Sequence, residues 1–350
     1  MTTDLFAIDF FCGAGGLTRG FLNVGIQVIL GIDSDSNCRI TYESNNSPAK
    51  FLCSDIRDLD PEDISKYIKD IPRNQIIFAG CAPCQPFTKQ RSKTKYPEQR
   101  TLLSEFARFV KAFKPGHVFV ENVPGIRKAV EKESPYREFI ELLDDLKYNF
   151  LDGVVDAKNY SVPQTRRRLI LLASRFRKME MPQPTHGSGL LPYPTVREAI
   201  AGYAPIKAGE THPKIPNHRA SDLSPINLKR ITNTSPNGGD RRDWPPDLRL
   251  ECHKNGYNGH TDVYGRMWWD KPAPALTSRC NSLSNGRYGH PKQNRAISLR
   301  EAAKLQSFDD SYIFHASSIN HMALQIGNAV PVKLAEAVGK AFYVNNGKLS

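Results

Sequence analysis

A single cysteine, Cys84, stands in a loop whose residue types suit a covalent nucleophile. The loop, Gly80 to Thr88, has the sequence GCAPCQPFT and follows the apolar run 75–79, which predicts a short buried strand. A proline on each side of the thiol stiffens the loop, and ligands of open α/β sheets bind beyond the carboxyl ends of strands. Two alternatives stay open here: an inert buried thiol, and a redox pair or half of a zinc site formed with Cys81.

Charged side chains also flank two other predicted buried strands. Glu121 follows the apolar run 118–120 directly, where a carboxylate is expensive to desolvate, so its proton affinity is expected to rise. A structural carboxylate at a strand end is the alternative. Three arginines, Arg166 to Arg168, precede the apolar run 169–173, and their guanidinium forks suit a phosphate or a base carbonyl.

The N-terminal segment predicts a strand, a glycine turn and a helix in succession. Residues 5–11 are apolar apart from one aspartate, the sequence CGAGG follows at 12–16, and helical spacing begins at Leu17. Such a turn lets the backbone pass close to a nucleotide-like ligand. Its spacing differs from the G-x-G-x-x-G dinucleotide fingerprint, so a pyrophosphate cradle is not predicted.

Carboxylates also end the next two predicted strands. The strand 27–32 leads to Asp33, which is placed to accept hydrogen bonds from ribose hydroxyls. Capping of the following helix by Ser34 or Asp35 is an alternative that is compatible with that role. The stretch 51–56 brings Asp55 to a third strand end, within reach of an adenine amino group.

Composition bounds the class of protein and its partners. In 350 residues, 48 lysines and arginines exceed 36 aspartates and glutamates, and the net charge of +12 favours a polyanionic partner. Seven scattered cysteines predict reduced thiols, and the absence of a signal peptide or a long apolar run predicts a cytoplasmic protein. The stretch from about 182 to 295 is rich in Pro, Gly, Asn, His and Arg, which predicts a second, irregular domain. Its cysteines and histidines fit no zinc spacing, so no metal is expected.

Taken in order, six motifs resemble the DNA cytosine-5 methyltransferase family, in its bacterial modification-enzyme form. They are DFFCGAGGLTRGF, the Cys84 loop, ENV at Glu121, QTRRR at Gln164, RAISLREAAKLQSF from Arg295 and GNAVP from Gly327. The matches lie towards both ends of the chain and leave mainly the middle unmatched. The resemblance implies an α/β fold: an S-adenosylmethionine-dependent, Rossmann-like, mostly parallel sheet with an inserted smaller, irregular target-recognition domain.

The resemblance also implies a division of the chain and a cofactor site. Residues 1–181 and 315–350 would form the catalytic domain that binds S-adenosyl-L-methionine, 182–295 the target-recognition domain, and 296–314 a connecting helix. Many family members place a large aromatic residue against the adenine where this chain has Ser34. The residues expected around the cofactor are Phe11, Gly13, Gly15, Leu17, Asp33, Ser34, Asp55, Ile56, Leu102, Asn328 and Val330.

Four side chains would carry the implied reaction. Carbon 5 of cytosine is too weak a nucleophile to take a methyl group, so the thiolate of Cys84 adds first at carbon 6. Glu121 would protonate ring nitrogen 3, while Arg166 and Arg168 hold the base carbonyl and the thiol loop. The target base must leave the duplex, as in methyltransferases generally. The implied partners are double-stranded DNA and a possible cognate restriction endonuclease acting on the same site, with the enzyme a monomer.

Three rival hypotheses explain less of the sequence. Methylation of transfer RNA does not explain a basic middle domain of a size suited to groove readout. A non-catalytic nucleic-acid-binding module explains the charge but not the cysteine, glutamate and arginine set. A zinc or redox protein built on Cys81 and Cys84 leaves the other motifs unexplained. No simple code links a side chain such as Arg241 or Arg287 to a base pair, so the sequence does not give the recognition site. The polar, basic segment 89–100, next to the Cys84 loop, is expected to close over DNA.

Overall fold

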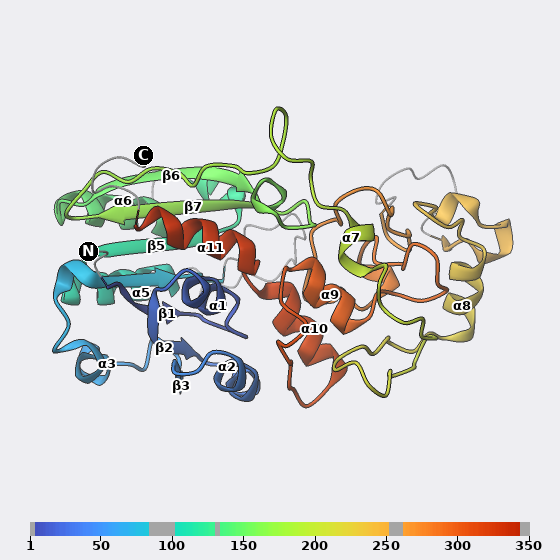
Figure 1. Ribbon diagram of the computed structural model, residues 1–350, viewed down its shortest axis with the longest axis horizontal. Helices are drawn as coiled ribbons and strands as arrows, with labels where there is room; N and C mark the ends of the chain where they lie inside the picture. Colours follow the sequence, from blue (N-terminus) through green and yellow to red (C-terminus); the bar gives the residue numbers. More distant parts are fainter. Residues whose placement is uncertain (1–3, 84–101, 130–133, 252–261, 344–350) are drawn as a thin grey trace. The chain divides into compact units, whose positions relative to one another are not determined.

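The computed structural model describes residues 4–83, 102–129, 134–251 and 262–343. The chain forms two compact units (Figure 1). Unit 1 comprises Met1–Asp156, Arg167–Pro184 and Val332–Ser350, and unit 2 comprises Ala157–Arg166 and Thr185–Pro331. The segment 315–331 thus groups with the middle of the chain, whereas the predicted division assigned it to the catalytic domain. The functional division into catalytic and recognition domains stays a prediction.

Unit 1 is built on a seven-stranded sheet in the order β3-β2-β1-β4-β5-β7-β6. The first five strands along the chain pair in parallel, and β7 runs antiparallel to both of its neighbours, so the predicted mostly parallel α/β sheet is confirmed. Because the strand order reverses between β1 and β4, ligands are expected at the carboxyl ends of these strands. The strands are β1 (Phe6–Phe10), β2 (Gln27–Asp33), β3 (Lys50–Cys53), β4 (Ile76–Gly80), β5 (His117–Asn122), β6 (Asn149–Asp156) and β7 (Arg167–Ser174).

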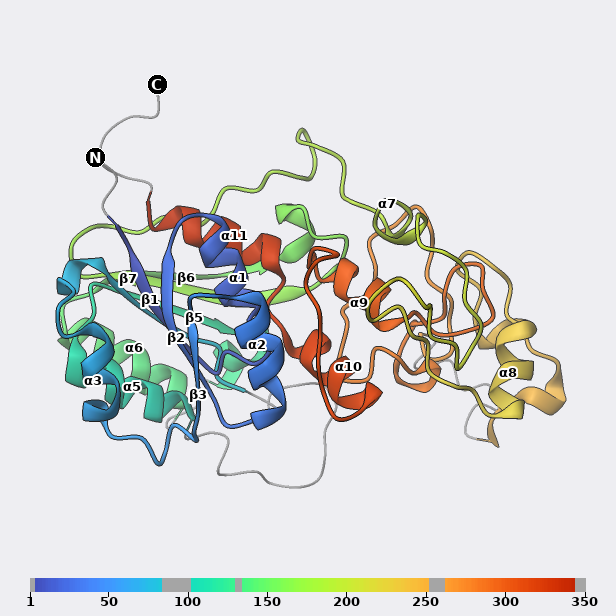
Figure 2. The same ribbon diagram turned by 60° about the horizontal axis from the view of Figure 1, so that its bottom comes forward.

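Helices cover both faces of this sheet (Figures 1 and 2). One face carries α1 (Gly16–Asn23), α2 (Arg39–Asn45) and α11 (Val332–Ala341). The other carries α3 (Pro61–Ile68), α5 (Leu102–Phe113) and α6 (Pro135–Asp145). The described part of unit 1 also holds short 3-10 helices at Ser36–Cys38, Arg73–Gln75 and Pro124–Ala129.

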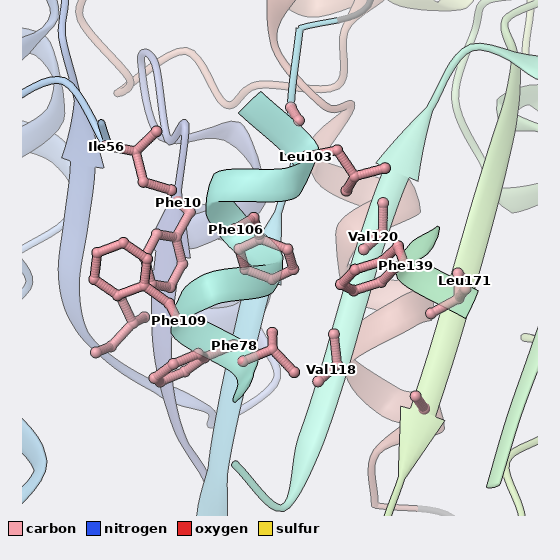
Figure 3. Close-up of a cluster of buried hydrophobic side chains, with 14 of the residues drawn as sticks. Phe10, Ile56, Phe78, Leu103, Phe106, Phe109, Val118, Val120, Phe139 and Leu171 are labelled. Carbon is pink, nitrogen blue, oxygen red and sulfur yellow. The ribbon is translucent and has the colours of Figure 1, made fainter. Parts of the chain in front are cut away.

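A hydrophobic core of unit 1 lies between α5 and the sheet (Figure 3). Apolar residues at helical spacing predict a helix over 101–113, and α5 confirms it. Its Phe106 packs against Phe10 of β1, with ring centroids 5.2 Å apart. A Cβ on Gly80 would lie only 3.1 Å from the Phe106 ring. The glycine therefore lets α5 pack tightly beneath the end of β4, where the Cys84 loop begins.

The C-terminal helix α11 returns to the N-terminal part of unit 1. It packs on α1 so closely that a Cβ on Gly20 would lie 2.3 Å from the Cβ of Ala335 and 2.7 Å from the carbonyl oxygen of Val332. Only a glycine fits such an approach. The helix α11 thus lies against the helix that begins at the N-terminal glycine turn.

Unit 2 has little regular structure, as its composition predicts. Its helices are α7 (Val196–Ile200), α8 (Pro225–Thr232), α9 (Leu299–Leu305) and α10 (Ile319–Asn328), with 3-10 helices at Ala157–Tyr160, Arg241–Asp243, Pro246–Leu248 and Leu283–Asn285. Backbone carbonyls that pair in no sheet need other donors. Arg266, only 1% exposed, supplies them to Ile231, Thr234 and His290 at 2.7 to 2.9 Å. This burial lowers the pKa of Arg266 to about 10.

Candidate active site at the carboxyl ends of the unit 1 strands

The glycine turn after β1 is tied to the end of β2 through Asp33. The backbone N–H of Gly13 donates to Oδ2 of Asp33 (2.8 Å), and that of Asp35 donates to Oδ1 (2.9 Å). Phe11, Gly13 and Gly15 adopt left-handed φ angles of 62°, 51° and 85°. A Cβ at Gly13 would meet nothing within 4 Å, so the turn is open on that side. Burial raises the pKa of Asp33, and the two backbone N–H groups oppose the rise.

These features fit the adenosyl part of S-adenosylmethionine. Each Asp33 oxygen already accepts one backbone N–H and can accept a further hydrogen bond, as ribose hydroxyls require. Ser34 is exposed, and Asp35 accepts the N–H of Asn37 as the cap of the following 3-10 helix. Capping therefore falls to Asp35 and leaves Asp33 at the turn.

At the end of the third strand, Asp55 has a partner within the protein that was not expected. Asp55 is half-buried and forms an ion pair with Arg57 (Oδ2 to Nη2, 2.7 Å), which sequence analysis did not single out. The hydrogen bond from Arg57 holds the pKa of Asp55 below its ordinary value. Ile56 is buried in the core that Phe10 shares. Leu17 is buried as well, while Leu102 is half-buried against that core. Contact of these residues with the cofactor stays a prediction.

Asp9 is a buried carboxylate of β1 that sequence analysis did not single out. It is 1% exposed. The hydroxyl of Thr18 donates to its Oδ2 (2.7 Å), and the Tyr42 hydroxyl lies 2.9 Å from the same Thr18 oxygen. Burial raises the pKa of Asp9 to about 7, and the charge of Asp33 adds to the rise. The signal in the sequence was a lone acid within an otherwise apolar strand.

We expect the stability of unit 1 to fall between about pH 4 and pH 7 because of Asp9. Over that range the folded protein holds a proton that the unfolded chain has released, so the free energy of unfolding decreases as the pH rises. A pKa raised from 3.8 to about 7 corresponds to a loss of about 4 kcal/mol. In urea titrations at a series of pH values, Asp9→Asn should remove most of this pH dependence of the free energy of unfolding. Asp144→Asn, on the exposed side of α6, is the control for loss of one carboxylate. Equal slopes for wild type and Asp9→Asn would contradict the assignment.

The loop that carries the predicted nucleophile is held at its start. Cys84 itself lies outside the described residues, as does the segment 89–100 that was expected to close over DNA. The backbone N–H of Cys81 donates to the carbonyl of Phe10 (3.3 Å). The buried amide of Asn122 donates to the carbonyl of Ala82 (3.2 Å). Asn122, which sequence analysis passed over, therefore fastens the loop to the end of β5.

Glu121 and Arg168 meet across the antiparallel pair of β5 and β7. The register sets Glu121 opposite Ile170, two residues from Arg168. Oε1 of Glu121 lies 2.7 Å from Nε of Arg168, and the two side chains are 11% and 17% exposed. The fold thus places two predicted catalytic side chains in one ion pair, beside the strand whose Asn122 fastens the loop.

Cys81 is poorly suited to act as a thiolate. Burial raises the pKa of its thiol well above the ordinary value, and the carboxylates of Glu121 and Asp9 add to the rise. A neutral thiol is neither a good nucleophile nor a metal ligand. Among the residues that the structure describes, no group of three His, Cys, Asp or Glu side chains could hold a metal ion.

Arg166 belongs to unit 2, where it is buried. Its Nη1 donates to the carbonyl of Leu276 (2.7 Å) and its Nη2 to that of Gly327 (3.1 Å). These bonds join two segments of unit 2, a structural task that the motif did not reveal. Asn328, which is exposed, and Val330, which is buried, also belong to unit 2, and their contact with the cofactor stays a prediction.

The fold and the site define a methyltransferase class: the chain belongs to the C-5 cytosine-specific DNA methylase family, whose model matches residues 5–343. It is 40% identical over 339 residues to the Type II methylase M.HgiDII of Herpetosiphon aurantiacus, covering 95% of this chain and 94% of that protein. It is 32% identical over 339 residues to the Type II methyltransferase M1.HphI of Haemophilus parahaemolyticus, covering 95% and 85%.

Solved structures share the fold at lower identity. A prophage-encoded E. coli protein assigned as a DNA modification methyltransferase superposes with a TM-score of 0.74 at 22% identity, covering 97% of this chain and 99% of that one. The Entamoeba histolytica methyltransferase EhMeth gives a TM-score of 0.62 at 14% identity, covering 97% and 98%. None of the helices described here has the length and apolar character that crossing a membrane requires.

Proposed function

We propose that the chain transfers a methyl group from S-adenosyl-L-methionine to carbon 5 of a flipped-out cytosine in duplex DNA, through a covalent adduct with Cys84. The observation that carries the proposal is a convergence at one edge of the sheet. The Gly13–Asp33 turn, the anchored start of the Cys84 loop and the Glu121–Arg168 pair all follow or flank the strands around the β1/β4 reversal. Family membership supports the same chemistry.

The cofactor site uses the turn and the carboxylates of β2 and β3. Asp33 binds the ribose hydroxyls, Asp55 accepts from the adenine amino group, and the open side of Gly13 receives the adenosyl moiety. When bound, S-adenosylmethionine supplies an electrophilic methyl group. The exposed Ser34 offers the adenine no aromatic surface.

The residues of the chain prepare the base for methylation. The Cys84 thiolate forms a bond to carbon 6, while Glu121 delivers a proton to ring nitrogen 3, so electron density builds at carbon 5. Arg168 orients Glu121 through their ion pair and holds the base carbonyl. After carbon 5 takes the methyl group, its proton passes to water, ring nitrogen 3 returns its proton to Glu121, and the bond between carbon 6 and the Cys84 sulfur breaks, which restores the ring. Arg166 joins the Leu276 and Gly327 segments within unit 2.

The relatives support a biological setting for this reaction. The two curated relatives cited are Type II enzymes, which supports a bacterial modification enzyme paired with a restriction endonuclease of the same specificity. Unit 2, with 20 lysines and arginines against 12 aspartates and glutamates (20 − 12 = +8), supports the target-recognition role proposed for 182–295. The enzyme then acts as a monomer in the cytoplasm, on the nucleoid.

Mapping of 5-methylcytosine tests this function directly. The purified protein is incubated with mixed-sequence duplex DNA and S-adenosylmethionine, and 5-methylcytosine is then located at base resolution. We expect one cytosine within a short recurring sequence to be methylated. A parallel reaction with transfer RNA tests the main rival substrate. Methylation of RNA alone, or of no nucleic acid, would refute the proposal.

A further inference from the structure

Most arginines of unit 2 are committed to bonds within the protein. Arg266, Arg287, Arg295 and Arg300 are buried and donate to several carbonyl or carboxylate oxygens each. Even exposed arginines have partners: Arg197 pairs with Asp270 at 2.6 Å, and others pair likewise. Most guanidinium groups of unit 2 are thus bonded to its own carbonyls and acids, and Arg287, for which no code gives a base pair, is one of them.

Two arginines differ from this pattern. Arg219 and Arg279 are exposed, and neither guanidinium has a hydrogen bond or ion pair anywhere in the part of the chain that the structure describes. Long arginine side chains that face water without a partner are available to an external anion. Because the pairing of the other arginines is so consistent, these two stand out as candidate ligand contacts.

One hydrogen bond, between Ser221 and Asn281, joins the two segments that carry these arginines. Arg219 faces outward between the buried His218 and Ala220, and in such an extended stretch Ser221 points to the same side. The amide of Asn281 donates to the Ser221 hydroxyl (2.9 Å), and Arg279 lies two residues before Asn281. Arg219 therefore lies two residues before one partner of the Ser221–Asn281 hydrogen bond, and Arg279 lies two residues before the other.

The segment that carries Arg279 is rigidly held by motif residues. The backbone of Leu276 accepts from Arg166 (2.7 Å) and donates to Gln164 Oε1 (2.9 Å). A Cβ on Gly327 would lie 2.0 Å from the carbonyl oxygen of Thr277, so the last turn of α10 packs directly on the same backbone. The turn that closes from Thr277 to Cys280 then presents Arg279 to solvent.

We propose that Arg219 and Arg279 bind two phosphates of the DNA backbone and fix the duplex on unit 2. This inference rests on the proposed function and adds its phosphate contacts. Beside the two arginines, the amide of Asn281 donates to Ser221 and to Asn320, which carry no charge. The exposed carboxylate next to Ser221, that of Asp222, already accepts the backbone N–H of Leu223 (2.8 Å). Gln164 and Arg166 act as positioning residues, because they set the backbone that carries Arg279 and touch no phosphate themselves.

The salt dependence of DNA binding tests the proposal. Each lost phosphate contact should lower the slope of log Kd against log salt by about 0.9. Between 50 and 200 mM salt, the Kd of a variant that lacks one contact should therefore rise about 3.5-fold less than the Kd of wild type. Arg219→Ala and Arg279→Ala should each lower the slope by this amount, and the double variant should lower it by about twice as much. Arg279→Lys keeps the charge, so its slope should stay close to that of wild type. The effect should be the same on cognate and unrelated duplexes. KM for DNA should rise while kcat at saturating DNA stays unchanged.

Arg197→Ala is the matched control, since it removes an exposed arginine of unit 2 whose guanidinium is already paired with Asp270. Its slope should equal that of wild type. Wild-type slopes in Arg219→Ala and Arg279→Ala, or a loss confined to the cognate sequence, would overturn the inference. If the wild-type enzyme methylates DNA in the same buffer, that result leaves the proposed function standing. A wild type that neither binds nor methylates duplex DNA overturns both.

Discussion

Cys84→Ser is expected to abolish methylation, with kcat reduced by about three orders of magnitude or more. A serine hydroxyl is scarcely ionised near neutral pH, and no motif of the sequence supplies it with a base. The sharper measurement is covalent trapping. Fluorine at carbon 5 of the target cytosine blocks the final proton loss, so the methylated adduct cannot be eliminated. Wild type should form a complex with such DNA and S-adenosylmethionine that survives denaturation, and Cys84→Ser should form none.

Two further variants separate the proposed roles in the same assay. Cys81→Ser should still form the adduct, because burial keeps the pKa of the Cys81 thiol high and the nucleophile lies elsewhere. Glu121→Gln should form it slowly, since a neutral amide cannot deliver a proton to ring nitrogen 3. An adduct that mass spectrometry maps to Cys81, or one that persists in Cys84→Ser, would refute the proposed mechanism.

Glu301→Ala should destabilise unit 2 by about 3–5 kcal/mol, the usual cost of breaking a buried ion pair on one side. Both oxygens of Glu301 bind the Arg295 guanidinium at 2.7 Å, and the two side chains are 1% and 0% exposed. One oxygen also accepts the N–H of Ser298 (2.7 Å) in the capping box of α9. The variant leaves a buried cation with fewer acceptors and an open helix terminus.

Tryptophan fluorescence in a urea titration measures this effect in unit 2 alone. The three tryptophans of the chain, Trp244, Trp268 and Trp269, all belong to that unit. Asp270→Ala, which breaks the exposed pair with Arg197, is the control and should cost about 1 kcal/mol or less. A loss below about 1 kcal/mol in Glu301→Ala would show that Arg295 finds other acceptors and that the pair contributes little.

The order of the motifs along the chain and the periodicity of apolar residues predicted where much of the site lies. Apolar runs that end in Gly13, Asp33 or Glu121 predict strands followed by polar ligands, and parallel strands place such ends at one edge of a sheet. The irregular middle of the chain follows from its composition, whereas the resemblance to the family implied the mostly parallel fold and the return of the C-terminal helix. The motif series was specific enough to indicate the family before any contact was known.

Tertiary structure alone decided which polar groups meet. The Glu121–Arg168 pair depends on the register of two antiparallel strands, and the bond from Asn122 to Ala82 joins residues that no local pattern relates. Arginines are the clearest case. The same residue type serves as a buried donor at Arg266 and faces water at Arg279, because in a domain without regular ladders the packing decides which carbonyls lack partners.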